Sequence, residues 1–193
     1  MQSLLNLVGA VVIGALVLLT IFGRAMTLNQ TSTEKTFTLN LQTNAVTAAR
    51  VFEYDLVKAG FHVPKGTAIT QADSVSITFK ADLHDVGTIN TVQYYLSSVT
   101  DPKVSVTQNP RDRVLHRVVS GLGTTNAILG LTNLKFAYYD SIGNTTNVLA
   151  NIRSIYARMD FESAERVIKP IDTPSDTAFP GVYWEKTIYP RNI

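Results

Sequence analysis

The 193-residue sequence contains no cysteine, which excludes disulfide bonds, thiolate nucleophiles and thiolate metal sites. Its first proline is Pro64, so before that position no missing backbone donor interrupts a helix. Charge is sparse: 17 Lys and Arg balance 15 Asp and Glu, and the basic residues are scattered. The sequence therefore lacks the clustered basic surface of a nucleic-acid-binding protein, and its fold must be held together by packing.

One long run has no charged side chain. It extends from Leu4 to Phe22 and as a helix would be about 28 Å long, close to the thickness of a bilayer's hydrocarbon core. Small residues at Ala10 and Gly14 would let another helix approach closely. Because most of the chain follows the run, we expect the short N-terminus on the inner side of the membrane. The residues expected to contact lipid or sibling helices are Leu4, Leu5, Val8, Val12, Leu16 and Leu19.

A cleaved export signal is the alternative interpretation of this run. Gly23 and Ala25 supply the small residues that signal cleavage requires. Against it, no basic residue precedes the run, and the run is longer than the apolar core of most signals. A membrane anchor is therefore the favoured interpretation.

A second helical pattern follows. Apolar residues recur every three or four positions, which predicts a helix with one buried face docked on a globular unit. Thr31 to Glu34 resembles a capping box at which a helix could restart. No Pro or Gly separates Arg24 from Ala59, however, so we predict one helix from about residue 3 to Lys58, ended by Gly60. The docking stripe comprises Phe37, Leu41, Ala45, Ala48, Phe52 and Leu56.

Beyond Gly60 the hydrophobic period changes to two, as in half-buried strands. Residues 126–131 are expected to form a loop or a turn of helix, and Trp184 and Ile188 are expected to tie the C-terminal tail to the sheet. The predicted strands are residues 75–83, 92–96, 113–119, 134–139 and 152–161.

These patterns predict an α+β fold in which the helix packs on one face of an antiparallel sheet. We expect three parts. Residues 1–25 form a transmembrane or filament-core helix, residues 26–60 its amphipathic continuation, and residues 61–193 a globular head with an extended C-terminal tail.

The sequence predicts no catalytic, cofactor or metal site. The three histidines, His62, His84 and His116, are not linked by any metal-ligand spacing. Calcium binding by the acidic residues of the tail, Asp172, Asp176 and Glu185, is an alternative left open.

Tyrosines recur on the predicted strands. By alternation some of them must face outward, where aromatic side chains suit contact with a partner subunit or a secreted substrate. The candidates are Tyr95, Tyr139 and Tyr156. Burial beneath the C-terminal tail would explain them equally well.

Several strings of the sequence are similar to those of one known superfamily. They are ARVFEYDLVKAGF at the predicted helix end, SVSITFKADLHDVGTINTVQYYL, RDRVLHRVV, NLKFAYYDSIGN and IRSIYARMDF along the strands, and YPRNI at the C-terminus. In this order they resemble the type IV pilin-like superfamily, most closely the J-type minor pseudopilins of type II secretion and the W-type minor type IV pilins. The resemblance covers most of the chain, although each string is degenerate.

The resemblance implies a non-enzymatic subunit without cofactors. Its N-terminal helix would enter the membrane and pack with other pilin or pseudopilin subunits, with the head in the bacterial periplasm or on a cell-surface filament. The N-terminus departs from the family, whose members have a basic leader ending in Gly and a Glu at the fifth mature position. Met1 to Leu5 has neither, so either the sequence is already trimmed or the subunit is not processed, and the role of that Glu does not carry over. A subunit without it would sit at a filament tip or, equally, never enter a filament.

Two other functions stay open on the sequence. The chain could be a lone membrane-anchored envelope module that binds a partner through its sheet. It could also be a secreted enzyme or adhesin that follows a signal peptide.

Overall fold

A single helix, α1 (Gln2–Val57), forms the N-terminal part of the chain in this computed structural model, and its 56 residues make a rod about 84 Å long. The structure describes residues 2–104, 107–121, 123–166 and 179–193; the side chains of Leu5 and of residues 123–129 are outside the description. The expectation of one continuous helix is confirmed. The hydroxyls of Thr27, Thr31 and Thr33 donate to carbonyls four residues earlier, so they bond within the helix rather than capping a new one.

The rest of the chain forms one antiparallel sheet in which every strand pairs with its sequence neighbours, in the order β1-β2-β3-β4-β5-β6-β7. The α+β class is thereby confirmed. The strands are β1 (Ile69–Ala72), β2 (Ser76–Ala81), β3 (Asn90–Leu96), β4 (Arg113–Val119), β5 (Gly123–Tyr139), β6 (Ser154–Glu162) and β7 (Gly181–Ile188), with a short 3-10 helix η1 (Leu149–Asn151) between β5 and β6. The short edge strand β1 was not predicted from the sequence, and β7 was expected only as a tail that Trp184 and Ile188 tie to the sheet.

β5 corrects one prediction. Residues 126–131, expected as a loop or helical turn, belong to a 17-residue strand that pairs first with β4 and, from Leu131 onward, with β6. The register shifts between Leu131 and Asn133, beside Gly130, which has φ +88. A Cβ on Gly130 would lie 3.0 Å from the carbonyl oxygen of Glu162. Glycine therefore marks a bulge and a close backbone approach here, not the end of a strand.

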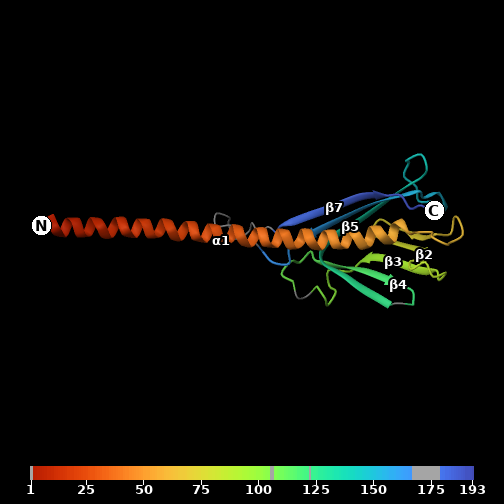
Figure 1. Cartoon of the computed structure of the whole chain (residues 1–193), viewed down its shortest axis with the longest axis horizontal. Coiled ribbons are helices and arrows are strands. Elements are labelled where there is room, and N and C mark those ends of the chain that lie inside the picture. Colours follow the sequence, from red (N-terminus) through yellow and green to blue (C-terminus); the bar gives the residue numbers. More distant parts are fainter. Residues whose placement is uncertain (1, 105–106, 122, 167–178) are drawn as a thin grey trace.

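The sheet flanks only the C-terminal half of α1, and the N-terminal half projects away from the head (Figure 1). The buried core combines one face of the helix with the inward side chains of the strands. On β6, Ile155, Ala157, Met159 and Phe161 are buried. Tyr156, Arg158 and Asp160 are only half-buried, as the alternation predicted.

The end of α1 is fixed by contacts with β2 and with the C-terminal tail. Gly60 has φ +83, and its N–H donates to the Lys80 carbonyl at 2.9 Å. The N–H of Asp82 donates to the Phe61 carbonyl at 3.0 Å. The C-terminus lies beside this end of the helix (Figure 1), and a Cβ on Gly60 would lie 2.8 Å from the carbonyl carbon of Asn192.

Replacing Gly60 by alanine is expected to lower the free energy of unfolding more than replacing Gly66. Both glycines have positive φ, so each alanine carries about 1–2 kcal/mol of backbone strain. Only at Gly60 would the new Cβ also collide with Asn192, because nothing lies within 4 Å of a Cβ at Gly66. Urea unfolding of the full chain in detergent measures both losses. Equal losses would contradict a role for the tail in fixing the helix end.

Candidate functional site: the exposed helix and its attachment to the head

The N-terminal half of α1 exposes apolar side chains on every side. Leu4, Val8, Val12, Leu16 and Leu19 are between 52% and 69% exposed. Leu5 lies in the helix, but its side chain is outside the described part of the structure. The most apolar 18-residue window of α1 has a mean hydropathy of 2.6 and none of it is buried. Among the described residues α1 is the one helix long and apolar enough to cross a membrane, although a signal sequence shares these features.

The docking stripe faces the sheet. Phe37 is half-buried where the helix enters the head, and the later members of the stripe are buried. Phe52 lies at the centre with no exposed surface, and its ring centroid is 4.9 Å from that of Tyr94, 5.7 Å from that of Phe136 and 6.1 Å from that of Trp184. Burying such aromatic groups together is a main source of packing energy. The buried stripe members are Leu41, Ala45, Ala48, Phe52 and Leu56.

A buried ionic group joins α1 to the middle of the sheet. Asp55, which is 1% exposed, accepts a hydrogen bond from the Tyr94 hydroxyl at 2.6 Å. It also accepts two from the Arg117 guanidinium, from Nε at 2.6 Å and from Nη2 at 3.2 Å. Burial, followed by the adjacent Asp55 carboxylate, raises the pKa of Tyr94 well above its ordinary value. We call these three residues the helix–sheet lock, because they join α1, β3 and β4.

Sequence reasoning missed the helix–sheet lock, although its signal was present. Asp55 stands between Phe52 and Leu56 on the apolar stripe, where a charge requires a partner. Arg117 lies on the same face of β4 as Leu115 and Val119, both of which are buried. A charge on each of two buried faces is the pattern that predicts an ion pair across their interface.

The three candidate tyrosines lie half-buried on the outer face of the sheet, Tyr95 on β3, Tyr139 on β5 and Tyr156 on β6. Tyr139 and Tyr156 are diagonal neighbours on β5 and β6, because Tyr139 pairs with Ser154 and Tyr156 with Ala137. Tyr95 stacks on His116 with ring centroids 4.8 Å apart, and His116 pairs with Asn126. Tyr95 therefore contacts β4, whereas Tyr139 and Tyr156 lie next to each other across β5 and β6.

Of the candidate calcium ligands of the tail, Glu185 alone lies among the described residues. Asp172 and Asp176 lie outside the described residues. Glu185 is on β7, where its carboxylate accepts a hydrogen bond from the Tyr156 hydroxyl at 2.8 Å and lies 3.5 Å from Arg158 Nη1. Glu185 thus belongs to a cross-strand polar ladder on the outer face of the sheet.

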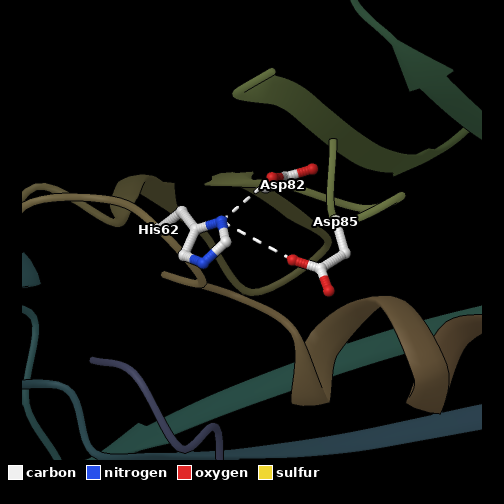
Figure 2. Close-up of side chains that lie close together, drawn as sticks. All are labelled: His62, Asp82 and Asp85. Carbon is white, nitrogen blue, oxygen red and sulfur yellow. Dashed lines mark hydrogen bonds and ion pairs between the residues drawn. The ribbon is translucent and has the colours of Figure 1, made fainter. Parts of the chain in front are cut away.

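A different cluster of ligand-type side chains lies where the helix end meets the β2–β3 turn (Figure 2). His62 Nδ1 is 3.0 Å from Asp82 Oδ2 and 3.9 Å from Asp85 Oδ1. Asp82 is fully buried, and the N–H groups of Val86 and Gly87 donate to it at 3.2 and 2.7 Å. Hydrogen bonds from His62 and these two amides lower the pKa of Asp82 to about 2. We call His62, Asp82 and Asp85 the junction cluster.

The junction cluster could not be found from sequence spacing. His62 is separated from Asp82 by 20 residues, and the intervening chain includes both β1 and β2. The two segments meet only because β2 ends beside the turn that follows α1. A polar turn of composition His-Asp-Val-Gly was the one local signal.

A second buried carboxylate, Asp112, has a different environment. Its side chain has no exposed surface, and among the described residues neither oxygen meets a donor at good hydrogen-bond geometry, although the nearby Thr107 hydroxyl acts to lower its pKa. Burial, and to a lesser extent the nearby Glu162 carboxylate, raise the pKa of Asp112 above its ordinary value. The protonated, neutral form is therefore favoured more than in a solvated aspartate.

Comparisons with known proteins add no relative: no family model, curated protein or solved structure matches the chain. In general shape the chain is pilin-like, with a long N-terminal helix and an antiparallel sheet.

Proposed function

We propose that this protein is a non-enzymatic structural subunit of the minor pilin or pseudopilin type. The N-terminal half of α1 inserts into the membrane and then packs against the helices of sibling subunits. The subunit lies within, or at the tip of, a type IV pilus or a type II secretion pseudopilus. Its head faces the periplasm of a bacterial inner membrane or the surface of a filament, where it is available to a secreted substrate.

The observation that carries this proposal is the all-round exposure of the apolar half of α1. The exposed members of the run face in all directions around the axis, so a single groove on one partner could cover only part of them. Lipid, or a bundle of similar helices, covers every side. The head remains outside because the stripe and the helix–sheet lock hold the second half of the same rod against the sheet.

A single-pass anchor would expose the same helix, so the experiment must separate anchoring from assembly. An affinity tag inserted after Ile142, which is 80% exposed in a turn, allows recovery of the full chain from native membranes. The filament proposal expects other pilin-like chains to co-purify. Replacing residues 1–25 by an unrelated apolar helix of equal length should keep the protein in the membrane and eliminate these partners.

Two outcomes would reject the filament role. If no pilin-like chain co-purifies with the natural sequence, the assembly partner is missing. If the same partners are recovered after the helix is replaced, the contacts lie in the head and the protein is an anchored binding module.

A further inference from the structure

We propose that the junction cluster of His62, Asp82 and Asp85 binds one divalent transition-metal ion, of which Zn²⁺ is the prime candidate. An imidazole nitrogen with two carboxylate oxygens is a ligand set that Zn²⁺ accepts, and water would complete the coordination. The inference is independent of the filament role, because it concerns the junction between the helix end and the head.

The distances suit a shared ion. Two ligand atoms held about 2.1 Å from a tetrahedral ion lie about 3.4 Å apart. The observed separations of His62 Nδ1 from the two carboxylate oxygens, 3.0 and 3.9 Å, lie on either side of this value. All three ligand atoms lie within 4.8 Å of one another. The Asp85 side chain is 68% exposed, so it is free to rotate toward an ion.

The cluster is built from a fixed ligand and two accessible ones. The backbone amides of Val86 and Gly87 donate to the Asp82 carboxylate and fix its orientation. The His62 side chain is 50% exposed, and Figure 2 shows its Nδ1 directed at both carboxylates. An ion can therefore reach the cluster from solvent without unfolding the head, and the buried ligand is already in place.

Backbone conformation marks the same residues. Among the described residues, His62 and Asp85 are the two non-glycine residues with positive φ, at 58° and 57°. Such conformations are costly for residues with a Cβ and persist where surrounding contacts demand them. Two of the three proposed ligands thus have left-handed backbone conformations, and their side chains lie close together.

The charge of the cluster also favours a divalent cation. Two carboxylates face one imidazole, which leaves net negative charge whichever protonation state His62 adopts. The nearest lysine of the helix end, Lys58, donates to the Leu83 carbonyl and lies over the Tyr54 ring, 4.6 Å from its centroid. In the described part of the chain no ion pair links Lys58 to either carboxylate. A bound ion would link the turn after α1, through His62, to the β2–β3 turn, through Asp82 and Asp85.

The test is to strip the full chain of metal with a chelator and titrate it with Zn²⁺ in detergent at neutral pH. Isothermal titration calorimetry measures the binding. We expect one saturable equivalent and a rise in the thermal midpoint on binding. His62→Asn and Asp85→Asn should each weaken binding by about tenfold or more. Asparagine tolerates positive φ better than other non-glycine residues, so both variants keep the backbone conformation.

His84→Asn is the matched control. His84 is exposed in the same turn, one residue before Asp85, but is not a member of the junction cluster, so its loss should leave the affinity unchanged. The proposal is overturned if the natural chain shows no saturable Zn²⁺ binding, or if His84→Asn weakens binding as much as His62→Asn. Binding of Ca²⁺ in preference to Zn²⁺ would also overturn it, because an imidazole ligand disfavours Ca²⁺.

Discussion

Replacing Val12 by lysine is expected to abolish assembly of the subunit while its head remains folded. Val12 lies near the middle of the uncharged run and is 52% exposed, with no contact to the sheet. A lysine at the centre of a membrane helix costs about 3 kcal/mol on insertion scales, which corresponds to roughly a hundredfold change in an equilibrium. In a bundle of apolar helices the ammonium group would be equally without a partner.

The measurement compares the fraction of subunit recovered in membranes and in sheared filaments. Val12→Leu, which keeps the side chain apolar, should behave as the natural sequence does. Ile142→Lys places the same new charge on an exposed apolar position of the head and should also leave assembly intact. Normal recovery of Val12→Lys in filaments would contradict the assembly role of the N-terminal half of α1.

The parts of the fold that follow a local period were predictable. The stripe from Leu41 to Leu56 needed only the 3.6-residue repeat, because the helix is unbroken and one face meets the sheet. On β6 the inward and outward positions followed from alternation alone. These signals are local, so they can be recognised without knowing which segments of the chain pack together.

The parts that depend on which segments meet were not predictable. Residues 126–131 were expected to form a loop or a turn of helix, but the chain continues through a bulge at Gly130 because β5 changes partners there. The junction cluster joins residues 20 positions apart, and the helix–sheet lock joins Asp55 to a residue 62 positions later. Both groups depend on tertiary contacts, which the spacing of residues along the chain does not show. For the helix–sheet lock, the charged Asp55 and Arg117 on otherwise apolar faces were the one sequence signal.

The two halves of α1 therefore have opposite requirements. In the proposed membrane or helix bundle, the run from Leu4 to Phe22 in the first half must present no charged side chain. The second half includes the buried carboxylate of Asp55. Any packing of the helix on the sheet that left this charge without a partner would be unfavourable. A stripe of leucine, alanine and phenylalanine could slide by a turn along the sheet, whereas Asp55 can satisfy Tyr94 and Arg117 in one register only. We infer that the lock fixes the register of the helix on the head.

Replacing Asp55 by alanine is accordingly expected to lower the free energy of unfolding by about 3–5 kcal/mol. The change leaves the Arg117 guanidinium, whose side chain is 17% exposed, without its carboxylate and the Tyr94 hydroxyl without its acceptor. Glu53→Ala is the matched control two residues earlier in the helix. It breaks the ion pair with Lys186, in which both side chains are more than a third exposed, and should cost no more than about 1 kcal/mol.

Urea unfolding of the full chains in detergent measures both losses, and a double variant tests the cause. If an unpaired guanidinium is responsible, Asp55→Leu combined with Arg117→Met should be more stable than Asp55→Ala, because an apolar pair leaves no buried charge unpaired. Equal losses for Asp55→Ala and Glu53→Ala would show that the lock contributes no more than a surface pair. Failure of the double variant to recover stability would instead assign the loss to the Tyr94 hydroxyl, which still lacks its acceptor there.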